Sequence, residues 1–154
     1  MIMGVYNAVN TLSEAIESIL KQTYTNWELV VCDDCSTDNS YELLLQYKNK
    51  YPDKIILLRN KENRRLSYTL NRCLENISGK YVARMDADDV MHPDRLKIQY
   101  AIMEAESSIT VCGTWMQYIG ERVQPQSIAI SSNGLVEFPL IQLMKGNFIF
   151  HPTA

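Results

Sequence analysis

Three carboxylates stand within four residues at Asp86, Asp88 and Asp89, directly after the mostly apolar run Tyr81–Met85. Such a run predicts a buried strand, and ligands of open α/β sheets bind at the carboxyl ends of strands. Hard cations such as Mg²⁺ prefer oxygen ligands and are commonly held by one or two carboxylates plus substrate phosphates. The pattern therefore indicates a divalent-cation site, although an acidic loop that faces water stays open as an alternative.

A second acidic residue, Asp34, comes shortly after another apolar run, Trp27–Val31. Its carboxylate can accept a hydrogen bond from a ring N–H of a base such as uracil, and Tyr6 can stack on that base. Asp86 and Asp88 are two residues apart, so in an extended chain they point to the same side and can share one Mg²⁺ or Mn²⁺. The sequence has no glycine-rich phosphate loop of the Walker type. The expected ligand is therefore a nucleoside diphosphate whose charge the cation neutralises.

Helices must alternate with strands to bring these groups to one edge of a sheet. The capping box Thr11-x-x-Glu14 predicts one helix start, Asp38 or Ser40 can cap a second helix, and Pro93 fits the first turn of a later one. Each predicted helix has apolar residues at helical spacing. These are Leu12, Ile16, Ile19 and Leu20; Leu43, Leu44 and Tyr47; Leu66, Leu70, Cys73, Leu74 and Ile77; and Leu96, Tyr100 and Met103.

Strands are predicted where runs of apolar or β-branched residues occur. They are Trp27–Val31, Ile55–Leu58, 81–86 and Ile109–Ile119. Gly79 is the expected C-terminal stop of the third helix. Residues 120–134 are expected to form a loop or an irregular hairpin, and residues 135–145 a short helix. This order predicts an α/β, Rossmann-like fold with a mainly parallel sheet and flanking helices.

The composition is that of an ordinary globular domain, with 154 residues, 46% hydrophobic and 21% charged residues. The net charge of −3 offers no basic field for a phosphate backbone, so no nucleic-acid partner is expected. No apolar run approaches the roughly 20 residues that span a bilayer, while a peripheral membrane association stays open. The four cysteines are expected to be free thiols in a reducing compartment, and the predicted location is cytoplasmic.

Several segments resemble family 2 glycosyltransferases, in that family's order and spacing. The resemblance is strong over residues 1–113, weak from there to about residue 146, and similar again over Asn147–Thr153. The segments that carry it are Val5–Asn7, Ser18–Tyr24, Trp27–Asp38, Gly79–Asp89 and Pro93–Leu96.

This resemblance implies an A-type glycosyltransferase fold that binds a nucleotide-sugar donor, usually UDP-linked, and transfers the sugar to an acceptor hydroxyl with inversion. Tyr6 matches the family position beside the base, and Asp34 matches the position that hydrogen-bonds it. Asp86 and Asp88 match the Asp-x-Asp that meets ribose, diphosphate and a Mn²⁺ or Mg²⁺ ion, with Asp88 the firmer metal ligand. The implied acceptor is a carbohydrate or a lipid-linked molecule, in polysaccharide biosynthesis.

Three positions depart from the family pattern. The family usually has proline where this chain has Gly4, and often has glycine where it has Cys35 and Arg65. We expect Arg65 to face solvent, with a contact to the donor as the alternative. Arg84 is expected either to pair with a site carboxylate or to contact the donor.

The family's general base is an acidic residue well downstream of the Asp-x-Asp, and no residue before Ala154 matches it. Asp89 and Asp94 are the nearby alternatives, although a loop or helix-cap role suits each better. Residues 1–154 are therefore expected to be the nucleotide-sugar-binding part of a glycosyltransferase domain, truncated at both ends and inactive in transfer by itself. A homodimer, and a position at the inner face of the membrane, stay open.

Two other functions fit parts of the pattern. A haloacid-dehalogenase-type phosphatase also places Asp-x-Asp after an apolar strand, with Thr or Val two positions beyond the second Asp, a position that Val90 occupies here. That chemistry also needs a later lysine and a paired acidic motif, and neither is identifiable in this sequence. A non-catalytic nucleotide-sugar-binding fragment is the other alternative. Manganese-dependent UDP binding, compared with phosphate release from small phosphomonoesters, distinguishes these functions.

Overall fold

The sheet at the centre of the molecule consists of parallel strands. The structure is a computed structural model and describes residues 1–114. β1 (Ile2–Val5), β2 (Leu29–Asp33) and β3 (Ile55–Arg59) lie in the order β1-β2-β3, and both neighbouring pairs are parallel. The predicted α/β class and parallel sheet are confirmed.

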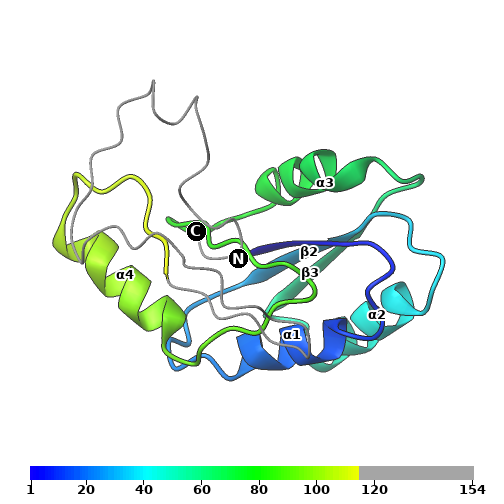
Figure 1. The fold of residues 1–154 in the computed structure, drawn as a ribbon, viewed down its shortest axis with the longest axis horizontal. Coiled ribbons are helices and arrows are strands. Elements are labelled where there is room, and N and C mark those ends of the chain that lie inside the picture. The colour runs from blue at the N-terminus through cyan, green and yellow to red at the C-terminus, as the bar shows by residue number, and fades with distance from the viewer. Residues whose placement is uncertain (115–154) are drawn as a thin grey trace, which may run out of the picture.

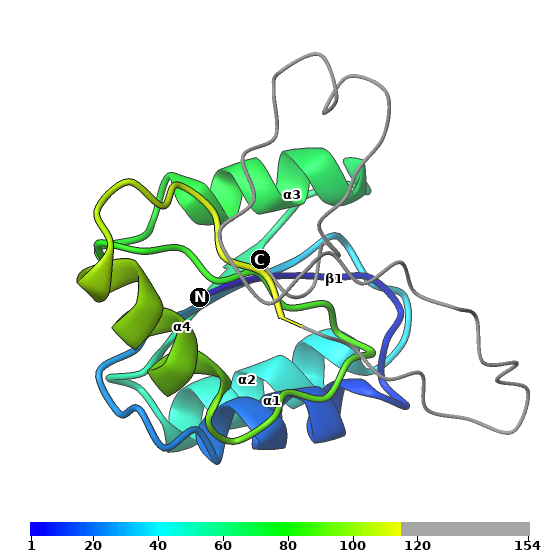
Figure 2. The same cartoon turned by 60° about the vertical axis from the view of Figure 1, so that its left-hand side comes forward.

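Helices cover both faces of this sheet. In Figures 1 and 2, α1 (Leu12–Leu20) and α2 (Ser40–Lys50) lie below it, and α3 (Arg65–Leu74) lies above it. α4 (Arg95–Ala105) lies at the side, where the Thr23 N–H donates to the Pro93 carbonyl at 2.9 Å. Each connection between successive strands therefore passes over the sheet through a helix, as parallel strands require.

Alternate residues of the strands serve two separate cores. Leu29 and Val31 of β2 pack with α1 and α2, whereas Val30 and Cys32 pack with Cys73 of α3. All five residues of β2 are buried. A strand that is covered on both faces reads as a continuous apolar run rather than an alternating one, which explains why the sequence located β2 and β3.

The strand predicted at 81–86 is reduced to one parallel bridge, between Arg84 and Ile2. The Ile2 N–H donates to the Ala83 carbonyl at 2.9 Å, and the Met85 N–H donates to the Ile2 carbonyl at 3.1 Å. The chain bends before residue 82 and turns again at residues 87 and 88. Only three residues are left to pair with β1, so a full strand does not form.

Several predicted ends are wrong. α3 ends at Leu74 rather than running to Gly79, because the Asn76 side-chain amide donates to the Arg72 carbonyl at 2.9 Å and its N–H to the Cys73 carbonyl at 2.9 Å. These bonds satisfy the last carbonyls and turn the chain away.

The starts of two helices also differ. Thr11 precedes α1, but no side-chain cap forms; its hydroxyl donates to the Ala8 carbonyl at 3.3 Å, so the predicted capping box is absent. Pro93 lies before α4 rather than in its first turn, because Asp94 takes the N-cap position. In α4, Leu96 is buried as predicted, whereas Tyr100 is exposed and stacks against Tyr24, with ring centroids 4.7 Å apart.

The predicted strand Ile109–Ile119 is not seen in its described part, since residues 109–114 are irregular. Its remainder, the loop and helix predicted over 120–145, and the segment Asn147–Thr153 lie outside the described residues. All four cysteines are free thiols, as predicted. Among residues 1–114, none of the helices has the length and apolar character needed to cross a membrane.

Candidate functional site

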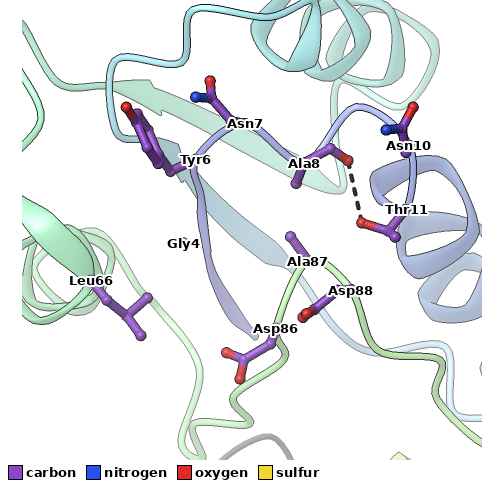
Figure 3. A pocket seen from close by; sticks show the side chains of 10 residues that line it. All are labelled: Gly4, Tyr6, Asn7, Ala8, Asn10, Thr11, Leu66, Asp86, Ala87 and Asp88. Carbon is purple, nitrogen blue, oxygen red and sulfur yellow. Dashed lines mark hydrogen bonds between the residues drawn. The ribbon is translucent and has the colours of Figure 1, made fainter. Parts of the chain in front are cut away.

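A pocket of about 500 Å³ opens at the carboxyl ends of β1 and of the segment that pairs with it (Figure 3). The chain leaves β1 through α1 on one face of the sheet and returns to the other side of β1 after α3 on the opposite face. Such a reversal is a topological switch point, where open α/β sheets bind ligands. The lining residues are Gly4, Tyr6, Asn7, Ala8, Asn10, Thr11, Leu66, Asp86, Ala87 and Asp88.

Residues 83–91, here called the carboxylate segment, bring two acidic side chains to this pocket. Met85 and Ala87 are buried in the main core, so the residues between and after them, Asp86 and Asp88, turn outward and line the pocket. Among the described residues, no hydrogen-bond donor contacts the Asp88 carboxylate. Both carboxylates therefore line the pocket, although the chain turns at residues 87 and 88 and the extended geometry on which the prediction depended does not continue to Asp88.

Asp86 has a partner from its own segment. The Arg84 Nη2 lies 2.8 Å from one Asp86 oxygen and 3.2 Å from the other, and the Arg84 Nε lies 3.2 Å from the first. The ion pair with a site carboxylate, one of the two alternatives expected of Arg84, is present in this structure. Asp88 is left as the carboxylate without a cation partner among the described residues.

The neighbouring Asp89 does not line the pocket, but it lies close enough to the Asp86 and Asp88 carboxylates to be affected by their charges. Its burial, followed by the charges of Asp88 and Asp86, raises the pKa of Asp89 above its ordinary value. Asp94 accepts a hydrogen bond from the Thr23 hydroxyl at 2.7 Å and stands at the N-cap of α4, which supports the helix-end role expected of it. Of the two carboxylates that line the pocket, Asp86 is paired with Arg84, so a cation is favoured chiefly at Asp88.

The opposite wall is formed by residues 6–11, which are hydrogen-bonded to residues 34–40 behind them. These two segments are here called the paired loops. Backbone N–H groups of the first loop donate to side chains of the second: Asn7 to Ser36 at 3.0 Å and Ala8 to Ser40 at 2.9 Å. The Asn7 side-chain oxygen accepts the Thr37 N–H at 2.8 Å in return.

Asp38 adds a bond to each loop. It accepts the Val9 N–H at 3.2 Å and the Ser40 N–H at 2.9 Å, so it ties the loops and holds the first residue of α2. The N-cap position itself is taken by Asn39, without a side-chain cap, rather than by Asp38 or Ser40 as predicted. These bonds fix the backbone on which Tyr6, half exposed, reaches the pocket. In Figure 3, Tyr6 lies at the upper end of the view and the two carboxylates at the lower end.

Asp34 does not line the pocket. Its carboxylate is buried and accepts hydrogen bonds from the Asn60 amide at 2.6 Å and from the Arg64 and Arg65 N–H groups at 2.8 Å each. Burial alone would raise the pKa of Asp34, but these hydrogen bonds outweigh it and hold the pKa below its ordinary value. Asp34 therefore joins the end of β2 to the start of α3.

Two of the departures from the family pattern adopt a left-handed backbone conformation. Cys35 has φ of 61° and Arg65 has φ of 67°, a region that favours glycine. Arg65 is exposed and does not line the pocket, as predicted. At Gly4, an added Cβ would lie 3.0 Å from Leu66 Cδ1, so glycine allows α3 to approach β1 closely.

The residues at this site fit a divalent cation only in part. Among the described residues, no group of three or more His, Cys, Asp or Glu side chains is placed to hold a metal ion. Asp86 and Asp88 supply carboxylate oxygens, which Mg²⁺ and Mn²⁺ accept, but a full coordination shell requires further oxygens from a ligand.

Sequence reasoning missed several lining residues. Asn10 and Thr11 belong to the loop before α1, and Leu66 was expected to face the core, whereas it is 47% exposed at the pocket. At Thr11 the sequence predicted a capping role, which gave no indication that this residue lines a pocket.

The family profile described as "Glycosyl transferase family 2" matches residues 1–153 of this chain. EpsE of Bacillus subtilis is 48% identical over 121 residues, which cover 79% of this chain and 44% of EpsE. The Escherichia coli UDP-Glc:alpha-D-GlcNAc-diphosphoundecaprenol beta-1,3-glucosyltransferase WfgD is 35% identical over 133 residues, 83% of this chain and 51% of WfgD. The chain thus spans about half the length of these relatives.

Two solved proteins have a similar structure, and one of them is named as a mannosyltransferase. S. aureus TarS 1–349, in complex with UDP, superposes with a TM-score of 0.67 and 26% identity over 82% of this chain and 38% of TarS. The mannosyltransferase PcManGT of Pyrobaculum calidifontis, in complex with GDP-Man and Mn²⁺, gives a TM-score of 0.58 and 29% identity over 62% of this chain and 29% of PcManGT. The predicted A-type glycosyltransferase fold is confirmed.

Proposed function

The chain belongs to glycosyl transferase family 2, and on this premise we propose that it binds a UDP-sugar for transfer to an acceptor hydroxyl with inversion, assisted by Mn²⁺ or Mg²⁺. The observation that carries the proposal is the pocket at the switch point of the sheet. There, Tyr6 from the end of β1 and Asp86 and Asp88 from the carboxylate segment line one volume. Nucleotide-sized ligands fit pockets of about 300–1,000 Å³.

Asp88, with Asp86, is proposed to hold the divalent cation together with oxygens of the donor diphosphate. When bound, the cation stabilises the negative charge that develops on the leaving diphosphate. The free carboxylate of Asp88 suits a metal ligand, and the related PcManGT forms a complex with both GDP-Man and Mn²⁺. Asp86 is proposed to contact the donor as well.

Tyr6 and Asp34 are proposed to bind the base. Tyr6 offers a half-exposed ring held by the paired loops. A carboxylate has about four lone-pair positions, and three donors reach Asp34: Asn60 and Arg64 at one oxygen and Arg65 at the other. The remaining position can accept a ring N–H of uracil. The TarS complex with UDP supports a uridine nucleotide.

The acceptor is proposed to be a carbohydrate or a lipid-linked sugar, since WfgD is named for a diphosphoundecaprenol-linked acceptor. A lipid-linked acceptor would bring the protein to the inner face of the membrane, through peripheral contact. No general base is assigned among the described residues. The phosphatase alternative is not favoured, because both the family match and the similar solved structures are glycosyltransferases.

The test is calorimetric binding of UDP, GDP and ADP to the chain, each with and without Mn²⁺. We expect UDP to bind more tightly than the others and only when Mn²⁺ is present. Asp34→Ala should lose the preference for UDP, because the ring N–H would lack its acceptor at a cost of about 1–3 kcal/mol.

Equal binding of all three nucleotides, or binding indifferent to Mn²⁺, would contradict the proposed function. Release of phosphate from p-nitrophenyl phosphate would instead support the phosphatase. UDP-sugar binding without sugar transfer by any protein that contains this chain would support a non-catalytic role.

A further inference from the structure

The ion pair between Arg84 and Asp86 divides the two pocket carboxylates into one that is occupied and one that is free. The guanidinium contacts both oxygens of Asp86, at 2.8 Å and 3.2 Å. Both side chains are largely shielded, with 17% of Arg84 and 27% of Asp86 exposed. Asp86 is thus neutralised by its own segment, while Asp88 has no such partner among the described residues.

Arg84 is held in place at its backbone. It forms the bridge to Ile2 of β1, and its carbonyl accepts a hydrogen bond from Arg95 Nη2 at 3.2 Å. Arg95 is itself buried beneath this segment. The backbone of Arg84 is therefore fixed, and its guanidinium contacts Asp86, which lies two residues later on the same side of the chain.

A divalent ion that requires both carboxylates must compete with this guanidinium. We propose that Arg84 is a positioning residue that holds Asp86 away from the cation as long as no nucleotide is bound, so that the cation binds only when a nucleoside diphosphate supplies the missing oxygens. The inference rests on the proposed function, and it deepens that function by making the order of binding a property of one side chain. With Asp88 as the single free carboxylate, the ion alone has too few protein ligands.

The test is calorimetric titration of the chain with Mn²⁺ alone, with no nucleotide present. Arg84→Met removes the charge and keeps an unbranched side chain, so it should free Asp86 and tighten Mn²⁺ binding about five- to tenfold. Arg84→Lys keeps a point charge without the planar fork and should fall between wild type and Arg84→Met. Lys80→Met is the matched control: it removes one positive charge from the preceding residues, where Lys80 pairs with Glu104. That variant should leave Mn²⁺ affinity unchanged.

A double variant separates positioning from a general change in charge or fold. Arg84→Met combined with Asp86→Asn should return Mn²⁺ affinity to the wild-type value, because the gain depends on the freed carboxylate. Unchanged Mn²⁺ affinity in a folded Arg84→Met protein, or an equal gain in Lys80→Met, would overturn the inference. Should Arg84→Met fail to fold, Arg84→Lys decides by the same comparison.

The proposed function is judged separately, by the Mn²⁺ dependence of UDP binding in the wild type. A wild type that binds Mn²⁺ and UDP together while Arg84→Met gains nothing for Mn²⁺ alone would leave the function standing and remove the role of Arg84. A wild type that does not bind UDP would remove the function, whatever the Mn²⁺ titrations give.

Discussion

The two walls of the pocket are held in different ways. The paired loops are joined by hydrogen bonds between backbone N–H groups of one loop and side chains of the other, at Ser36, Asp38 and Ser40. The carboxylate segment has one bridge to the sheet, at Arg84. It is otherwise held through the buried Met85, Ala87 and Met91, the bond from Arg95 and the bond that the Met91 N–H donates to Ser18. The paired loops are thus hydrogen-bonded to each other before a ligand binds. The carboxylate segment instead presents metal ligands whose coordination shell only a bound ligand can complete.

The difference shows that the chain fixes the position of the loop that carries Tyr6 in advance, whereas the coordination of the cation depends on the ligand. Hydrogen bonds at Asn7, Ala8 and Val9 fix the backbone that follows Tyr6, which lowers the entropy cost of ordering this wall when a ligand binds. The carboxylate segment has too few ligands to hold a cation by itself, so binding of the cation depends on oxygens from the nucleotide. Substitutions that change one wall at a time test this difference.

The largest effect is expected at the carboxylate segment. Asp88→Asn keeps the size of the side chain but removes a charged ligand, so Mn²⁺-dependent UDP binding should weaken about a hundredfold, since even the loss of a residue that supports a metal ligand costs 10–100-fold. Calorimetry with UDP and Mn²⁺ measures it. Asp94→Asn is the control, because Asp94 lies at the N-cap of α4 and does not line the pocket. An equal loss in both variants would mean that general negative charge, not ligation, attracts the cation.

The next effect is expected at Asp34, at the start of the second paired loop, and concerns the free energy of unfolding. Asp34→Asn places an amide where one carboxylate oxygen accepts the Arg65 N–H, so at least one buried donor loses its acceptor. The free energy of unfolding at neutral pH should fall by about 1–3 kcal/mol. Urea unfolding followed by circular dichroism measures it. A variant as stable as wild type would show that Asp34 does not hold α3 to β2.

The contribution of Asp34 should also depend on pH in a definite direction. Its folded pKa lies below its ordinary value, because hydrogen bonds from the Arg64 and Arg65 amides and Asn60 overcome the opposing effect of burial. The folded state therefore prefers the ionised form. The stabilisation is complete above the unfolded pKa of about 3.9 and is lost as the pH falls through the folded pKa.

Urea midpoints of wild type and Asp34→Asn, measured from pH 7 down to the acid limit of folding, test this dependence. The gap between the two proteins should narrow at the lowest pH, because wild-type Asp34 then becomes protonated. A gap that stays constant over the whole range would assign the loss in Asp34→Asn to shape rather than to charge.

The sequence predicted the structure of the paired loops less well than it predicted the acidic residues of the carboxylate segment. Asp86 and Asp88 were located by residue type and spacing alone, and β2 and β3 by continuous apolar runs. The hydrogen bonds that Ser36 and Ser40 accept from N–H groups of the first loop were not foreseen, because Ser40 equally suits a helix cap. Which backbone group such a side chain meets is decided by tertiary contact, nearly thirty residues away or more in the chain.

Local propensity also failed where side chains compete with the backbone. The early end of α3 depends on the Asn76 amide reaching the Arg72 carbonyl, and nothing in the apolar period through Ile77 marks that competition. The buried place of Asp34 is a similar case. A carboxylate at a strand end is exposed by default, and only the approach of the Arg64 and Arg65 amides buries it.

The smallest effect concerns backbone strain next to the hydrogen bonds that Asp34 accepts from Asn60, Arg64 and Arg65, here called the Asp34 clamp. Cys35 follows Asp34 and Arg65 donates to it, and both have positive φ, which costs a residue with a side chain roughly 1–2 kcal/mol. Cys35→Gly and Arg65→Gly should each raise the free energy of unfolding by about 0.5–1 kcal/mol, since the greater freedom of glycine in the unfolded chain offsets part of the relief. Urea midpoints measure the gain.

Lys21→Gly is the matched control, because Lys21 is exposed and has φ of −83°, where a side chain is not strained. It should lower stability, so that glycine is favourable at the two strained positions and unfavourable at this one. If all three variants lost stability equally, Cys35 and Arg65 would carry no relievable strain. If the two gain as expected, the clamp at Asp34 is strong enough to hold two residues in a conformation that their own side chains resist, and the rigidity of that wall originates in the clamp.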